Sequence, residues 1–115
     1  MSELSELRED LQRFALERDW DQFHSPKNLA MALVAEAGEL VEHFQWLTEA
    51  QSREVAPDKL EKIEHELADV LIYLVRLADK LGVDLSEAAR AKMAINARKY
   101  PADIVKGSAK KYSEY

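Results

Sequence analysis

Residues 29–47 read LAMALVAEAGELVEHFQWL, and this stretch decides the expected fold. Its apolar residues recur at helical spacing, which predicts one long amphipathic helix. They form two neighbouring stripes along that helix. The first stripe is Leu29, Leu33, Leu40 and Leu47, and the second is Ala30, Val34, Ala37 and Val41. Because a helix that is apolar on two sides is buried on two sides, we expect a partner subunit in addition to the chain's own helices.

The rest of the chain also follows helical spacing, and no stretch alternates like a half-buried strand. Ser25 and Pro26 form a typical cap and first turn for the long helix, and Gly82 is placed to end a later one. The expected helices cover about residues 4–18, 26–47, 58–81 and 85–100. The sequence therefore predicts an all-α four-helix bundle, with a domain over residues 1–101 and a polar, partly mobile tail over residues 102–115.

Composition limits the classes of function. The chain has 115 residues, which suits one domain, and a formal charge of -6, which argues against duplex nucleic acid as a partner. It has no cysteine, so thiolate metal sites are excluded. No window approaches eighteen uninterrupted apolar residues, and the first ten residues, MSELSELRED, do not read as a signal peptide. We therefore expect no membrane association and a cytoplasmic location.

Two acidic residues occupy an unexpected place on the long helix. At about 100° per residue, Glu36 and Glu39 project beside the leucine stripe, whereas Glu42 lies on the outer side. A carboxylate at the edge of an apolar stripe faces other helices. Its loss of water is unfavourable by several kcal/mol unless something positive pairs with it.

The third expected helix repeats this arrangement. Glu66 and Asp69 lie at the edge of its apolar stripe, and Tyr73 follows one turn after Asp69 on the same side. If the two helices pack antiparallel, four carboxylates converge, and all-oxygen ligands favour magnesium or manganese. A di-iron site is disfavoured because such sites use Glu-x-x-His pairs. The alternative is that each acidic pair belongs to a solvated helix face.

Several segments resemble a known family. EAGEL (36–40), HELADVLIYLV (65–75) and KMAINARKYP (92–101) resemble the MazG-like all-α nucleoside triphosphate pyrophosphohydrolases. Within that family the chain is most similar to the dCTP pyrophosphatase group. The segments that carry this closer likeness are ERDWDQFHSPKNLAMALVAEAGEL (17–40), FQW (44–46) and KKYSEY (110–115).

The resemblance implies a magnesium-dependent enzyme, with manganese as a substitute, that hydrolyses dCTP or related nucleotides to the monophosphate and pyrophosphate. It also implies a homodimer or a tetramer of dimers. One departure from the family pattern is Ala35, where many members have a glutamate, which puts the number of bound ions in doubt. The implied metal ligands are Glu36, Glu39, Glu66 and Asp69, and the implied nucleotide pocket is Trp20, Asp21, Gln22, Phe23, His24, Trp46 and Tyr73.

Other roles rest on residue type. Glu39 is our candidate for orienting or deprotonating the attacking water. Lys92 and Asn96, one turn apart, are candidates for phosphate binding, with a surface salt bridge or a capping role as the alternative. Trp20 and Trp46 are candidates for stacking on a base; the alternative is that both fill the core, which their sequence positions favour more for Trp46.

The sequence is compatible with three functions. The first is a dCTP-directed pyrophosphohydrolase that sanitises the nucleotide pool. The second is a hydrolase that accepts many nucleoside triphosphates, because one or two hydrogen bonds to a base edge decide discrimination. The third is a non-catalytic helical module that dimerises or binds nucleotides.

Overall fold

The computed structural model describes residues 2–109, and these residues form helices and loops with no β-strand among them. The predicted all-α class is confirmed. The helices are α1 (Glu3–Glu17), η1 (Asp21–Phe23), α2 (Pro26–Glu42), α3 (Glu49–Ser52), α4 (Pro57–Leu81), α5 (Leu85–Lys99) and α6 (Ala102–Val105). No helix of the described residues is long and apolar enough to cross a membrane.

The helix ends follow local capping chemistry. The Asn28 N–H donates to the Ser25 side-chain oxygen at 3.1 Å, and Pro26 occupies the first turn of α2. At the C-terminal end of α4, Gly82 adopts a left-handed backbone with φ of 69°. Glycine reaches this conformation without the strain that a side chain would cause. Both ends were predicted from the sequence.

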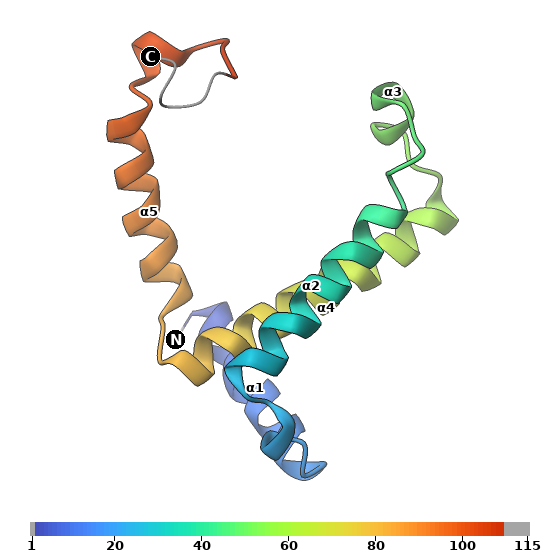
Figure 1. Cartoon of the computed structure of the whole chain (residues 1–115), viewed down its shortest axis with the longest axis vertical. Coiled ribbons are helices and arrows are strands. Elements are labelled where there is room, and N and C mark those ends of the chain that lie inside the picture. The colour runs from blue at the N-terminus through green and yellow to red at the C-terminus, as the bar shows by residue number, and fades with distance from the viewer. Residues whose placement is uncertain (1, 110–115) are drawn as a thin grey trace. The chain divides into compact units, whose positions relative to one another are not determined.

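The chain divides into two compact units, one extending to Val83 and the other beginning at Asp84. In the first unit, α2 and α4 lie side by side along much of their length, and α1 contacts α4 (Figure 1). The second unit contains α5 and α6. The predicted domain boundary at residue 101 stays a prediction, and residues 110–115 of the expected tail lie outside the described residues.

The predicted long helix ends earlier than expected. α2 stops at Glu42, and the chain continues in turns to Leu47. The His43 and Phe44 N–H groups donate to the carbonyls of Leu40 and Val41, three residues back rather than four. This tightening is a common way for the last turn of a helix to satisfy its free carbonyls. Trp46 therefore lies beyond the helix on which the sequence placed it.

The buried core of the first unit is small. Among the described residues, its buried apolar residues are Ala15, Leu29, Ile63, Val75 and Ala78. Of the second apolar stripe on α2, Val34 is 71% exposed and Val41 is 56% exposed in the single chain. This exposure agrees with the expected partner subunit, which stays a prediction.

Candidate metal and nucleotide site

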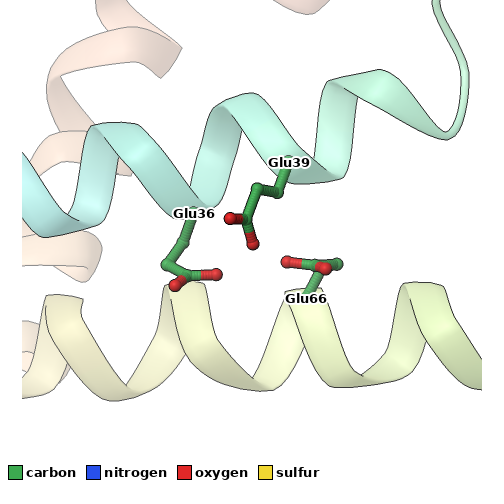
Figure 2. A group of neighbouring side chains, drawn as sticks. All are labelled: Glu36, Glu39 and Glu66. Atoms are coloured by element: carbon green, nitrogen blue, oxygen red, sulfur yellow. The ribbon is translucent and has the colours of Figure 1, made fainter.

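Three glutamates converge between α2 and α4. Glu36 and Glu39 extend from α2 toward Glu66 on α4 (Figure 2). One carboxylate oxygen from each residue can be chosen so that the three atoms lie within 4.8 Å of one another. The spacing of three residues places Glu36 and Glu39 on one face of α2. Because α4 lies alongside that face, Glu66 meets them there.

Two of these carboxylates have a buried oxygen with no hydrogen-bond partner: the Oε2 atoms of Glu36 and Glu66. Burial is the main cause that raises the pKa of Glu36 to about 7, followed by the adjacent carboxyl groups of Glu39 and Asp69. The pKa of Glu66 is also raised, first by burial and then by Glu39. Buried, unpartnered carboxylate oxygens suit a hard divalent cation, which prefers oxygen ligands.

His43 is a neighbour of this cluster that the sequence reading left outside it. Its Nε2 lies 4.0 Å from Oε1 of Glu66. The charge of His43 opposes the rise in the pKa of Glu66, although its effect is smaller than that of burial. The signal in the sequence was its spacing of four residues after Glu39, which places both side chains on the same side of a helix.

Asp69 stands apart from the three glutamates. It is absent from the group whose oxygens lie within 4.8 Å of one another. Its charge nevertheless contributes to raising the pKa of Glu36, so it lies within electrostatic reach. Asp69 also lines a cavity of about 420 Å³. Asp69 therefore lines the cavity and also acts electrostatically on one member of the glutamate cluster.

That cavity is lined mainly by apolar and aromatic groups. The cavity lining includes Trp20, His24 and Tyr73, all three of which were expected in the nucleotide pocket. The Trp20 ring meets Phe14 edge-on, with ring centroids 5.9 Å apart. The remaining lining residues are Leu11, Phe14, Ala15, Asp69, Ile72 and Arg76. A cavity of this size with a few polar groups is typical of a small-molecule site.

Other residues of the segment between α1 and α2 do not line this cavity. The Asp21 carboxylate accepts hydrogen bonds from Arg76 and Lys80. The Gln22 side chain donates to the backbone and side chain of Asp19, and Phe23 is 61% exposed. Their assignment to the nucleotide pocket stays a prediction.

Three further predicted residues are not among those that line the cavity. Trp46 is 86% exposed in the single chain, so the alternative that it fills the core does not hold for this chain alone, and its predicted stacking on a base stays a prediction. Lys92 and Asn96 are exposed on α5, in the second unit, and their phosphate-binding role stays a prediction.

Sequence reasoning missed Arg76. It is a buried cation on α4 that lines the cavity and contacts Asp21, His24 and Asp79. A signal was present, since Arg76 directly follows the apolar run VLIYLV (70–75) and falls one turn after Tyr73 on the same side of the helix.

Comparison with known proteins identifies the family. Residues 31–115 match the model of the MazG-like family. Human dCTP pyrophosphatase 1 is 49% identical over 112 residues, which cover 92% of this chain and 66% of that protein. The rat dCTP pyrophosphatase 1 is 48% identical over the same coverage. The chain thus spans just under two thirds of the length of these curated relatives.

A solved structure gives the same result for the fold. The crystal structure of a pyrophosphatase from Archaeoglobus fulgidus DSM 4304 matches with a TM-score of 0.82 and 40% sequence identity. The match covers 88% of this chain and 94% of the archaeal chain. With a family model that matches more than half of its length and a fold shared with this relative, the chain belongs to the MazG-like family.

Proposed function

We propose that the chain is a divalent-metal-dependent nucleoside triphosphate pyrophosphohydrolase that converts dCTP to dCMP and pyrophosphate. The observation that carries the proposal is the convergence of Glu36, Glu39 and Glu66, two of them with buried unpartnered oxygens. Asp69 links this cluster to an apolar cavity that contains Trp20. The likeness to proteins named dCTP pyrophosphatase 1 supports dCTP as the substrate.

In this proposal Glu36, Glu39 and Glu66 hold magnesium, or manganese in its place, and Asp69 completes the ligand set on the cavity side. The donor set fits, because it consists of carboxylate oxygens. A divalent ion at this position neutralises the charge that builds on the phosphoryl oxygens during hydrolysis.

Glu39 is our choice for orienting or deprotonating the attacking water. It is the most exposed of the three glutamates. A general base must lie within hydrogen-bond reach of the attacking water, and the exposure of Glu39 leaves its carboxylate accessible to water. The more buried Glu36 and Glu66 are better suited to a ligand role, because their oxygens have no other partner.

The cavity supplies the proposed base site. The indole of Trp20 offers a flat face for stacking, and Tyr73 lies one turn beyond Asp69 on α4. Trp46, exposed in the single chain, becomes a further base contact if a second subunit covers it. We accordingly propose that the active form is a homodimer or a tetramer of dimers.

The function is tested by analysing the products of dCTP hydrolysis with magnesium and with excess chelator. We expect dCMP and pyrophosphate in equal amounts, and no turnover with chelator. Release of dCDP and phosphate, or no release at all, would contradict the proposal. Comparison of kcat/KM among dCTP, CTP, dTTP, dATP and dGTP separates a dCTP-directed enzyme from a broad one, since comparable values would favour the broad alternative.

A further inference from the structure

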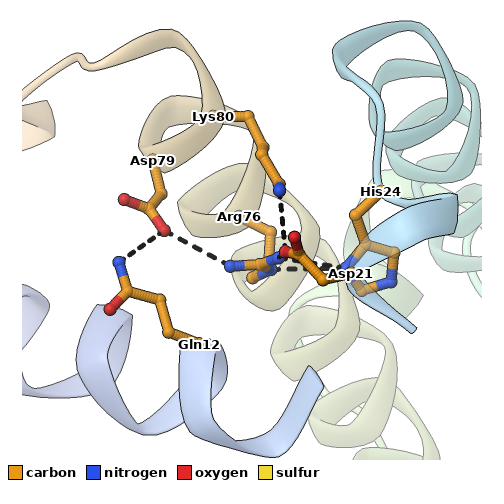
Figure 3. A network of polar contacts seen from close by, with 6 residues as sticks. All are labelled: Gln12, Asp21, His24, Arg76, Asp79 and Lys80. Atoms are coloured by element: carbon orange, nitrogen blue, oxygen red, sulfur yellow. Dashed lines mark hydrogen bonds and ion pairs between the residues drawn. The ribbon is translucent and has the colours of Figure 1, made fainter. Parts of the chain in front are cut away.

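Arg76 is a charged residue enclosed within the first unit. Only 3% of its surface is exposed. A buried charge is stable only when it is paired and hydrogen-bonded, and Arg76 has two carboxylate partners. Its guanidinium lies 2.9 Å from Oδ1 of Asp21 and 3.3 Å from Oδ2 of Asp79 (Figure 3).

Each of these carboxylates has a second partner. Lys80 Nζ donates to Oδ1 of Asp21 at 2.7 Å, and Gln12 Nε2 donates to Oδ2 of Asp79 at 2.8 Å. The resulting network connects α1, the η1 segment and α4 within one unit. Arg76 and Lys80 both donate to Asp21, and these two bonds hold the η1 segment against α4.

Arg76 also contacts His24 through the ring nitrogen Nδ1. Two guanidinium nitrogens approach this atom, Nε at 3.4 Å and Nη2 at 3.2 Å. A guanidinium has only N–H donors, so Nδ1 acts as the acceptor and the imidazole proton sits on Nε2. The second ring nitrogen is turned away from the guanidinium (Figure 3).

The surroundings of His24 favour the neutral form of its ring. Burial lowers the pKa of His24, and the positive charge of Arg76 lowers it further. Asp21 acts in the opposite direction and Lys80 adds a smaller lowering effect. His24 therefore offers one N–H donor in a cavity whose lining is otherwise largely apolar.

We propose that Arg76 is a positioning residue: it fixes the segment from Trp20 to His24 against α4 and presents His24 as a neutral donor, protonated on Nε2, to an acceptor atom of the bound nucleotide. The substrate in this proposal rests on the proposed function. The proposed tautomer of His24 does not depend on the proposed function, because it follows from the contacts of Arg76 with Nδ1. Loss of Arg76 then weakens substrate binding rather than the chemical step.

The first arm of the test is made on the unsubstituted chain. The ring nitrogens of His24 are observed by long-range ¹H–¹⁵N NMR in the ¹⁵N-histidine-labelled chain near neutral pH, with the His24→Asn spectrum as the assignment control. We expect an unprotonated Nδ1 and a protonated Nε2. A proton on Nδ1, or averaging between the two tautomers, overturns the proposal, whether or not the chain hydrolyses dCTP.

The second arm replaces Arg76 with methionine, which keeps similar length without donors. We expect KM for dCTP to rise about tenfold, the effect of one lost hydrogen bond and a loosened segment, with kcat changed less than about threefold and the His24 tautomer preference lost. If Arg76→Met fails to fold, Arg76→Lys serves, since lysine keeps the charge but lacks the planar fork. The matched control is Arg53→Gln, whose side chain is 73% exposed. An unchanged KM with a lost tautomer preference overturns the proposal.

Discussion

Substitution of Glu36 by glutamine is expected to lower kcat/KM for dCTP by about a thousandfold, because the proposed metal ligand would contribute several kcal/mol of transition-state charge stabilisation. Glutamine keeps the shape of the side chain and removes its charge. One Glu36 oxygen is buried and has no hydrogen-bond partner among the described residues, which leaves this atom available to a metal ion. Activity is measured by pyrophosphate release at saturating magnesium.

The same substitution is expected to stabilise the metal-free folded chain. The pKa of Glu36 is raised from 4.5 to about 7 in the folded chain. Between these pH values the metal-free folded state holds a proton that the unfolded state has released, so stability falls as pH rises through this window. Glu36→Gln removes this loss, and the metal-free variant should melt at a higher temperature than the original chain at pH 8.

Glu42 provides the matched control for this prediction. It lies on the same helix but is exposed and outside the three-glutamate group. Glu42→Gln should leave both turnover and the pH dependence of melting close to those of the original chain. Full activity in Glu36→Gln would remove this residue from the metal site.

Asp69→Asn is expected to lower kcat/KM by about a hundredfold, less than Glu36→Gln. Asp69 lies outside the group of three close glutamates but lines the cavity and influences Glu36. In our proposal it completes the ligand set from the cavity side, where an amide oxygen still coordinates magnesium, although more weakly than a carboxylate. The loss should be partly reversed at high magnesium concentration.

Kinetics over a magnesium series checks this prediction. The matched control is Asp58→Asn, in the first turn of the same helix and exposed. A loss of activity in Asp69→Asn that no magnesium concentration reduces would argue that Asp69 acts on the substrate rather than on the metal.

Much of this arrangement follows from local sequence. Helical spacing and capping residues predicted the long helices because those signals act over a few residues, as Ser25 and Gly82 illustrate. The placement of Glu36 and Glu39 beside an apolar stripe predicted that they face another helix. Their meeting with Glu66 needed only one further assumption, that the two helices pack side by side.

The remaining features depend on tertiary contacts. Asp69 has the same spacing from Glu66 as Glu39 from Glu36, yet it lines the cavity outside the close group, and spacing cannot predict this difference. Arg76 looked like an isolated charge in an apolar run until the η1 segment brought Asp21 and His24 to it. Such partners are distant in sequence, so periodicity carries no information about them.

We propose that the glutamate cluster binds a divalent ion in place of a proton. The most direct measurement is calorimetric titration of the metal-free chain with Mn²⁺ at pH 8 and at pH 6, without nucleotide. The pKa of Glu36 is about 7, so a proton competes with the metal ion at pH 6. We therefore expect Mn²⁺ to bind at pH 8 and its affinity to be about tenfold lower at pH 6. Absence of binding at pH 8, or an affinity that does not change with pH, would contradict it.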